Sequence, residues 1–257
     1  MSDMDRWKDR VALVTGASSG TGRAIARELT CNGMRVAICA RREERLHELQ
    51  KELGGKAGKI LSVPADLRDE TQIAGLFDTI RKRWGGVDVL VNNAGLGHNA
   101  SLVDGKTDDW REMFELNVLA LSICTREAIK DMRQRCCDGY VIHISSMSGH
   151  RQPPSMKGTS MYMYNATKYA VRALTEGLRR ELRELGSGIR VTAISPGVME
   201  TEWAAKFHKS EGVAQEIFSE RKVIQPEDIA SIVRYVLSCP PHIQIHDLLV
   251  RSTTQEH

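Results

Sequence analysis

Short β-branched or apolar runs alternate with helix-length amphipathic stretches along most of this chain. The runs cover residues 11–15, 35–40, 59–63, 87–91, 140–145, 189–195 and 248–251. Such alternation is the pattern of repeated βαβ units, whose parallel strands are buried between two layers of helices. It predicts an α/β fold with a doubly wound parallel sheet of about seven strands, formed by residues 1–257 as a single domain.

Two connections between these elements are long, at residues 146–160 and 198–225. Long connections in compact domains usually carry function. We expect both to form substrate loops.

The composition excludes several classes of protein. Of the 257 residues, 41% are hydrophobic and 27% are charged, unlike a disordered, collagen-like or coiled-coil chain. The net charge of +3 comes from interleaved acids and bases and gives no general nucleic-acid footprint. No apolar stretch approaches the roughly 20 residues of a membrane helix, and the charged N-terminus lacks the apolar core of a secretory signal. We expect a cytoplasmic protein with no membrane span and no nucleic-acid partner.

The six cysteines contain no CxxC pair and no Cys/His spacing that would close a zinc tetrahedron. We therefore expect no metal site. The adjacent Cys136 and Cys137 allow two interpretations, a strained vicinal disulfide or two reduced thiols, and reduced thiols suit a cytoplasmic chain.

A glycine-rich turn follows the first predicted strand and leads into a helical pattern. Glycines in this context let the backbone approach a pyrophosphate, which binds the free amides at the helix N-terminus. The simpler alternative is a turn that only connects a strand to a helix. The candidate cofactor contacts in this turn are Gly16, Ser18, Ser19, Gly20, Thr21 and Gly22.

The second predicted strand ends at neutral Ala40, followed by Arg41 and Arg42. An acid at this point of a dinucleotide-binding fold would favour NAD. Guanidinium groups instead hold a 2′-phosphate through charge-assisted hydrogen bonds, so the sequence predicts NADP. Arg41 is the favoured contact and Arg42 the second, unless one of them only begins a solvated helix.

Tyr164 and Lys168 are four residues apart and share one face of the helix predicted over residues 164–185. The pKa of a free tyrosine is about 10, so acid/base work near neutral pH needs a few kcal/mol of phenolate stabilisation. Two unit charges about 4 Å apart interact by about 4 kcal/mol at an effective dielectric near 20. Lys168 and a positively charged nicotinamide are predicted to lower the pKa of Tyr164. The alternative is a chance amphipathic match.

These residues stand among further motifs, which are NNAG at 92–95, LNVLA at 116–120, HISS at 143–146 and SPG at 195–197. In this order they resemble the short-chain dehydrogenase/reductase family over nearly the whole chain. The resemblance implies a Rossmann-type fold and hydride transfer between a nicotinamide cofactor and an alcohol/carbonyl pair. It also implies a homodimer or homotetramer formed through the long helix, which carries small residues at Ala166, Ala170 and Ala173. Packing of those alanines on the chain's own sheet is the alternative.

The resemblance also implies a role for individual residues. Tyr164 would donate the proton, Lys168 would lower its pKa, Ser146 would polarise the substrate oxygen, and Asn117 would hold a water in a proton relay. The remaining cofactor contacts would be Asp66, Leu67, Asn93, Ala94, Gly95, Pro196, Gly197, Val198 and Thr201, besides Tyr164 and Lys168. Ser146 precedes Tyr164 by 18 residues, more than is usual in the family, so Ser145 and Ser148 are alternative polarisers.

The C-terminal sequence HDLLVRSTTQ at 246–255 lacks the Asp-Gly-Gly ending of many relatives. With LALSICTRE at 119–127 and MSGHR at 147–151, it resembles the branch of animal member-11 dehydrogenase/reductases and insect farnesol dehydrogenases. Ser252 stands where that branch is expected to have proline.

The residues expected near the substrate are mostly apolar and include adaptable methionines. They predict a hydrophobic ketone or aldehyde, which by resemblance is a keto-steroid, a terpenoid or a dicarbonyl. One alternative is a small β-hydroxy acid held by Arg151 or Lys157, and another is a non-catalytic NADP-binding module. His150 either binds a second substrate oxygen or caps the loop. The expected lining residues are Leu96, Met147, His150, Met156, Met161, Met199, Trp203 and Phe207.

Overall fold

The computed structural model describes residues 4–152, 159–219 and 222–255. Within them, seven parallel strands form one sheet in the order β3-β2-β1-β4-β5-β6-β7. The α/β fold predicted from the alternating pattern is therefore confirmed. The strands are β1 (Val11–Thr15), β2 (Arg35–Ala40), β3 (Lys59–Pro64), β4 (Val89–Asn92), β5 (Tyr140–Ile144), β6 (Arg190–Pro196) and β7 (Asp247–Val250).

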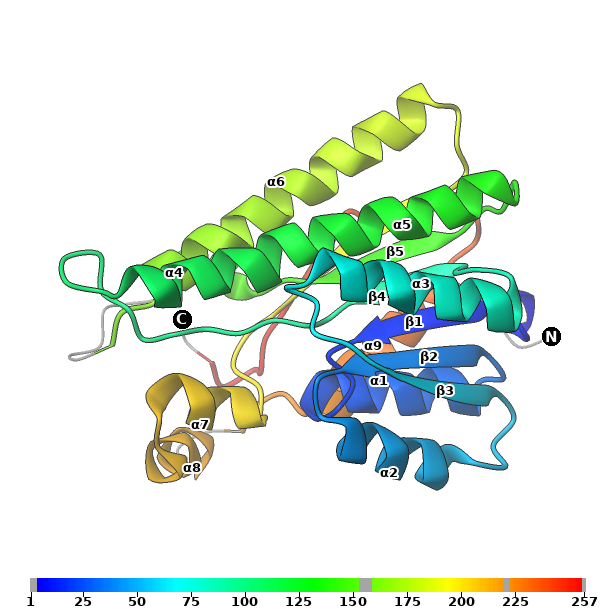
Figure 1. The fold of residues 1–257 in the computed structure, drawn as a ribbon. Coiled ribbons are helices and arrows are strands. Elements are labelled where there is room, and N and C mark those ends of the chain that lie inside the picture. The colour runs from blue at the N-terminus through cyan, green and yellow to red at the C-terminus, as the bar shows by residue number, and fades with distance from the viewer. Residues whose placement is uncertain (1–3, 153–158, 220–221, 256–257) are drawn as a thin grey trace.

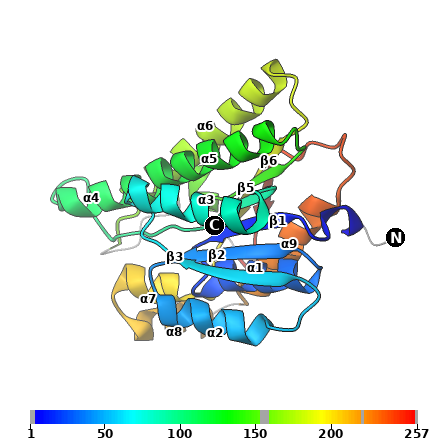
Figure 2. The same ribbon diagram turned by 45° about the vertical axis from the view of Figure 1, so that its right-hand side comes forward.

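Helices cover both faces of the sheet (Figures 1 and 2). One buried cluster joins the sheet to α1, α2 and α9, and a second joins it to α3, α5 and α6. Figure 1 shows α7 and α8 set apart from both layers. The helices are α1 (Gly20–Cys31), α2 (Glu43–Leu53), α3 (Glu70–Trp84), α4 (Thr107–Phe114), α5 (Leu121–Gln134), α6 (Tyr162–Glu184), α7 (Glu202–His208), α8 (Glu211–Ser219) and α9 (Pro226–Ser238).

Short helical turns complete the chain at Asp5–Trp7, Glu115–Ala120 and Met147–Gly149, the second of them a π-helix between α4 and α5. No helix in the described ranges is both long and apolar enough to span a bilayer. All six cysteines are free, and Cys137 Sγ donates a hydrogen bond to Asp88 Oδ1 at 3.1 Å.

The central strands are rich in apolar residues because they are buried on both faces. Every residue of β1, β4, β5 and β6 is buried. The predicted strand bounds agree with the structure to within one or two residues. β4 begins at Val89, two residues later than predicted, because the N–H of Val87 donates to Asp131 Oδ2 at 3.0 Å instead of joining the sheet.

The strand order reverses between β1 and β4, so the carboxyl ends of these strands flank a crevice. The glycine turn after β1 and the NNAG segment of β4 meet at this point. The chain that follows β6, predicted as a long loop over 198–225, instead contains α7 and α8. In the other predicted loop, residues 153–158 lie outside the described residues, and so do Met156 and Lys157 of the expected site.

A buried polar network docks α6 on the sheet. His143 of β5 shares a hydrogen bond with Thr175 of α6 at Nδ1 (2.9 Å) and with Thr125 of α5 at Nε2 (3.3 Å). Burial lowers the pKa of His143 to about 3, so the ring stays neutral. The network fixes the rotation of α6, which carries Tyr164 and Lys168.

The buried face of α6 is not the face that carries the small residues named from the sequence. Thr167, Val171 and Thr175 are buried, whereas Ala166, Ala173 and Leu174 are exposed. The inward face carries polar side chains because it serves the site and the His143 network. The alternative in which the alanines pack on the chain's own sheet is therefore wrong for Ala166 and Ala173.

Candidate active site

The glycine turn between β1 and α1 is braced by the end of β4. Asn93 Nδ2 donates to the Thr15 carbonyl oxygen at 2.9 Å, and the N–H groups of Asn93 and Ala94 both donate to Thr15 Oγ1 at 3.0 Å. Gly16 has a φ of +67°, and a Cβ there would lie 2.9 Å from Ala94 Cα. No side chain fits at this position, because the backbone at Ala94 lies so close to the turn.

The N-terminus of α1 fits a phosphate group. Its N-cap is Ser19, whose side chain makes no capping hydrogen bond. The first amides of a helix point outward and bind anions, with the helix dipole in favour. The first turn of α1, a helix of 12 residues, carries no acidic side chain that would compete with a bound phosphate.

The two arginines after β2 have different surroundings. Arg41 is exposed, and none of the hydrogen bonds and ion pairs among the described residues engages its guanidinium. Arg42 lies across the glycine turn, where its Nη2 donates to Ser18 Oγ (2.9 Å) and Ser19 Oγ (2.7 Å). Its Nη1 donates to Glu202 Oε2 at 2.9 Å. Arg42 therefore lies at the glycine turn but is paired with an acid, whereas Arg41 is exposed.

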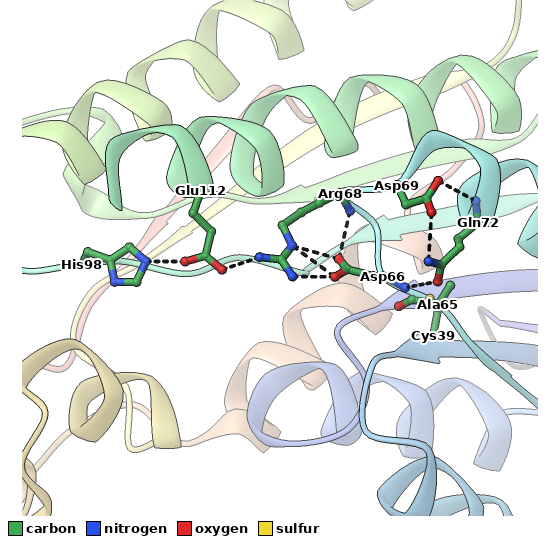
Figure 3. A network of polar contacts seen from close by, with 8 residues as sticks. All are labelled: Cys39, Ala65, Asp66, Arg68, Asp69, Gln72, His98 and Glu112. Atoms are coloured by element: carbon green, nitrogen blue, oxygen red, sulfur yellow. Dashed lines mark hydrogen bonds and ion pairs between the residues drawn. The ribbon is translucent and has the colours of Figure 1, made fainter. Parts of the chain in front are cut away.

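Asp66, the expected adenine contact, belongs to a chain of charged side chains (Figure 3). Arg68 donates to both of its carboxylate oxygens, and these hydrogen bonds lower the pKa of Asp66. Arg68 also donates to Glu112 at 2.6 Å, and Glu112 contacts His98 Nε2 at 2.7 Å. The chain connects the end of β3 to the loop after β4. Leu67, the expected cofactor contact that follows Asp66 in the sequence, is buried.

Tyr164 and Lys168 lie on the inward face of α6, and both side chains are buried, at 8% and 6% exposure. Lys168 Nζ donates to the Ile144 carbonyl oxygen at 3.1 Å and lies 5.7 Å from the centroid of the Tyr164 ring. A Cβ at Gly95 would lie 3.7 Å from Lys168 Nζ and 3.3 Å from Asn117 Oδ1. The backbone after β4 therefore approaches both side chains closely.

Asn117 joins that backbone to α6. Its Oδ1 accepts from the Leu96 N–H at 2.9 Å, and its Nδ2 donates to the Leu96 carbonyl oxygen at 2.8 Å and to Thr167 Oγ1 at 3.0 Å. The amide is buried within the π-helical segment. Asn117 thus connects the loop after β4 to Thr167, the residue before Lys168 on α6.

Ser146 is the serine that faces Tyr164. A hydrogen bond between the two side chains opposes the effect of burial on the phenol. Ser146 Oγ also accepts the N–H of Ser148 at 3.1 Å. The Ser145 hydroxyl, by contrast, is buried and has no partner among the described residues. Of the three candidate polarisers, Ser146 has the geometry for the role.

Burial dominates the ionisation of this site. It raises the pKa of Tyr164 to about 12 and lowers the pKa of Lys168 to about 8, because each charged form loses hydration. The chain's own groups therefore shift the phenol in the direction opposite to the predicted one. The lowering that the sequence predicted needs a further positive charge.

A family model described as short chain dehydrogenase matches residues 10–212. The chain belongs to the short-chain dehydrogenase/reductase family. It is 50% identical to dehydrogenase/reductase SDR family member 11 of Bos taurus, over 98% of this chain and 99% of the relative. It is 40% identical to the farnesol dehydrogenase of Aedes aegypti, over 96% of this chain and 98% of that protein. The family and the branch indicated by the motifs are confirmed.

Among solved structures, the fold is similar to the closed form of a serine dehydrogenase complexed with NADP⁺. The TM-score is 0.86 with 32% sequence identity, covering 96% of each chain. This short-chain dehydrogenase/reductase is therefore an enzyme of an oxidoreductase family. One point of its fold brings together Tyr164, Lys168, Ser146 and Asn117.

An apolar cluster surrounds Tyr164 in this short-chain dehydrogenase/reductase. The Trp203 ring lies 5.1 Å from the Tyr164 ring and stacks on Phe207 at 5.0 Å. Sequence reasoning missed several members of the cluster, although Trp110 and Met113 stand three residues apart on the amphipathic helix α4. The cluster consists of Leu96, Ala100, Trp110, Met113, Met161, Met163, Tyr164 and Trp203.

Three other residues that were expected to line the substrate site lie outside the apolar cluster around Tyr164. His150 Nε2 contacts Asp247 Oδ2 at 2.9 Å and Ser195 Oγ at 3.1 Å, so it ties the loop after β5 to β7. Met199 packs on the core around α1 and α9. Met147 is buried in the turn after Ser146.

The start of the segment after β6 is hydrogen bonded to β7 and to the residues that follow it. The Gly197 N–H donates to the Val250 carbonyl oxygen at 2.8 Å, and the Val198 N–H donates to Gln255 Oε1 at 3.0 Å. Thr201 caps α7, with its Oγ1 accepting the Trp203 N–H at 3.4 Å. Pro196 ends β6.

Proposed function

We propose that this protein is an NADP(H)-dependent oxidoreductase that interconverts a hydrophobic ketone or aldehyde and its alcohol. The observation that carries the proposal is the buried Tyr164, hydrogen bonded to Ser146, with Lys168 one turn away and apolar side chains around it. This arrangement supplies a proton donor and an oxyanion partner in a site from which water is largely excluded.

The proposed reaction divides between the cofactor and the chain. The reduced nicotinamide supplies a hydride to the carbonyl carbon when it is bound. Tyr164 gives its proton to the carbonyl oxygen, and the Ser146 hydroxyl donates a hydrogen bond to the same oxygen. Lys168 stabilises the phenolate that remains. The Lys168 ammonium favours that phenolate against the effect of burial, and a positively charged nicotinamide would add to its effect.

The proposed cofactor contacts begin at the glycine turn. The amides at the start of α1 would hold the pyrophosphate, and Asn93, Ala94 and Gly95 would form the wall of the crevice. Arg41 would hold the 2′-phosphate, because its guanidinium is exposed and follows neutral Ala40. The serine dehydrogenase of similar fold is complexed with NADP⁺.

The proposed substrate class follows from the cluster around Tyr164, which is apolar and rich in methionine. The Aedes aegypti relative is a farnesol dehydrogenase, consistent with a terpenoid. The second candidate is a small β-hydroxy acid, which the similarity to a serine dehydrogenase favours. A carboxylate would need a cation, and Arg151 is exposed in the loop after β5.

A panel of steroids, isoprenoid aldehydes, dicarbonyls and β-hydroxy acids tests this function. We expect NADPH oxidation with apolar carbonyls, and kcat/KM at least tenfold higher with NADPH than with NADH, because a 2′-phosphate gains an Arg41 contact. Carbonyl compounds are assayed with NADPH and NADH, and β-hydroxy acids with NADP⁺ and NAD⁺. Turnover of β-hydroxy acids alone would support the second candidate, and a protein inert on the whole panel would be a binding module.

We also propose that two or four copies of the chain associate through α5 and α6. An open groove of about 840 Å³ lies between these helices. Its lining includes Ile129, Ala173, Leu174 and Leu178, and Leu174 is exposed. A second copy would bury this apolar face.

Light scattering is expected to give a mass two or four times the 28.7 kDa of one chain. Leu174→Arg should shift the protein to a smaller species, because an arginine in the groove loses hydration on association. Leu185→Arg, at the exposed end of α6, is the matched control and should keep the wild-type mass. A wild-type protein with the mass of one chain contradicts the proposal.

A further inference from the structure

The turn after Ser146 is held to the sheet by one imidazole. His150 follows the short helical turn Met147–Gly149, and its Nε2 contacts Asp247 Oδ2 at 2.9 Å and Ser195 Oγ at 3.1 Å. Ser195 Oγ in turn donates to Asp247 Oδ1 at 2.8 Å. Asp247 begins β7, and Ser195 stands near the end of β6. The three side chains therefore join the loop after β5 to two neighbouring strands.

The hydrogen atoms of this cluster can all be placed. A carboxylate only accepts hydrogen bonds, so the ring nitrogen that faces Asp247 carries a proton. The Ser195 hydroxyl gives its hydrogen to Oδ1. The Nε2–H of His150 is then shared between Oδ2 and the Ser195 oxygen, and each polar atom in the cluster has a partner.

The same three residue types form the active site of serine hydrolases, but this cluster has a different geometry. In a Ser-His-Asp hydrolase the imidazole contacts the serine and the aspartate through different nitrogens. Here both contacts use Nε2, and Ser195 is completely buried. The cluster is therefore a structural tie and not a second reaction centre.

Backbone hydrogen bonds connect this tie to Ser146. Ser146 Oγ accepts the Ser148 N–H at 3.1 Å, and its carbonyl oxygen accepts the Gly149 N–H at 2.9 Å. The His150 N–H donates back into the same turn at 3.0 Å. At the other end, the Ser146 side chain is hydrogen bonded to Tyr164. A contact that fixes His150 therefore also fixes the Ser146 hydroxyl.

The tie acts on a long connection. Ser146 precedes Tyr164 by 18 residues, and a chain of that length does not fix the position of its own residues, because each has several accessible backbone conformations. Asn165 Nδ2 donates to Gln152 Oε1 at 3.0 Å and joins the loop to α6. The His150 contact joins it to the sheet, and the side chains of this contact are only 12% and 20% exposed. A hydrogen bond so largely removed from water is stronger than an exposed one.

We propose that His150, held by Asp247, is a positioning residue that keeps the Ser146 hydroxyl where it meets the substrate oxygen beside Tyr164. The inference rests on the proposed function, because that function gives Ser146 a hydrogen bond to the oxygen. His150 then acts through the turn Met147–Gly149 and not by its own contact with a second substrate oxygen.

Two amides of different length at position 150 test the proposal. Glutamine carries its Nε2 donor as many bonds from Cα as the imidazole Nε2, whereas the asparagine amide is one bond shorter. We expect His150→Asn to lower kcat about thirtyfold and His150→Gln at most about threefold, because loss of an oxyanion donor costs about 10²–10³ in kcat and a displaced serine loses part of that. NADPH affinity should stay within about twofold in both, because neither change alters the proposed cofactor contacts.

A second comparison separates positioning from a general loss of structure. Ser146→Ala alone should lower kcat about a hundredfold. Because His150 acts through Ser146, adding His150→Asn should have no further effect, and the double variant should match Ser146→Ala within about twofold. A merely structural role of His150 would multiply the two losses.

Hydrogen exchange of the turn, followed by NMR, gives a readout that needs no turnover. The Ser148 and Gly149 amides should exchange about tenfold faster in His150→Asn than in the wild type, and at the wild-type rate in His150→Gln. Equal exchange in His150→Asn and the wild type, or a double variant far less active than Ser146→Ala, would overturn the inference. A wild type that binds NADPH but reduces no carbonyl of the panel would overturn the proposed function and leave the exchange result to decide whether His150 holds the turn.

Discussion

Replacing Tyr164 with phenylalanine is expected to lower the rate of carbonyl-dependent NADPH oxidation by about a thousandfold, while NADPH affinity stays within twofold. The phenol gives its proton to the substrate oxygen in the proposed reaction, and general acid catalysis contributes about 10²–10⁴-fold. Phenylalanine keeps the ring that packs against Trp203, so the fold and the apolar cluster should persist. Steady-state kinetics and NADPH titration measure the two effects.

A matched control comes from the same helix. Tyr162 and Tyr169 lie on α6 close to Tyr164, and each is 39% exposed. Tyr162→Phe and Tyr169→Phe remove one hydroxyl each and should keep the wild-type rate. If Tyr164→Phe retained more than a tenth of the wild-type rate, another group would have to donate the proton.

Replacing Lys168 with methionine should make the protein more stable and less active. The pKa of Lys168 falls from 10.5 to about 8 because its ammonium is buried, and each unit corresponds to about 1.4 kcal/mol. Folding therefore costs the charged lysine about 3 kcal/mol below pH 8. Losing the hydrogen bond to the Ile144 carbonyl oxygen returns about 1 kcal/mol of that. We expect a net gain of about 2 kcal/mol in unfolding free energy at pH 7.

The sign of this effect depends on pH. Between pH 8 and 10.5 the unfolded wild-type chain holds a proton on Lys168 that the folded chain has released, so the stability of the wild type rises with pH in this window. The advantage of Lys168→Met should therefore shrink as the pH is raised to 10. Urea denaturation at pH 7 and at pH 10 measures both values.

The activity of Lys168→Met should fall at least a hundredfold, because the phenolate of Tyr164 loses its neighbouring cation. Lys82→Met, an exposed lysine on α3, should change neither the activity nor the pH dependence of stability. A Lys168→Met protein that is less stable than the wild type at pH 7, or whose advantage does not shrink with pH, would show that burial of the ammonium costs little. Stability lost to a functional group is common in enzyme sites.

Local patterns were enough to predict the sheet. Each central strand is a short, mostly apolar segment between turns. This composition is typical of strands that helices cover on both faces of a sheet. The site motifs were also predictable in part, because the spacing of Tyr164 and Lys168 puts them on one helical face whatever the tertiary structure. The resemblance favoured Ser146 over Ser145, and in the structure Ser146 is hydrogen bonded to Tyr164, whereas the Ser145 hydroxyl is buried without a partner among the described residues.

Other features depend on residues far apart in the chain. The pairing of Glu202 with Arg42 joins positions 160 residues apart, and no local pattern indicates it. The pKa of Tyr164 is set by how deeply α6 is buried, so a sequence argument that counted only the nearest charge predicted the wrong direction for the chain alone. The small residues Ala166 and Ala173 of α6 were visible in the sequence, but their exposure followed from the docking of Thr175 on His143.

By itself, the sequence determined the seven strands along the chain, the glycine turn and the tyrosine–lysine pair, because these depend on backbone geometry and hydrophobic period over a few residues. Only the tertiary structure decided which serine faces the phenol, that His150 binds Asp247, and that Glu202 pairs with Arg42 beside the turn. Those outcomes depend on distances between separate elements and on the loss of water around charged groups, and both arise only when the chain is packed.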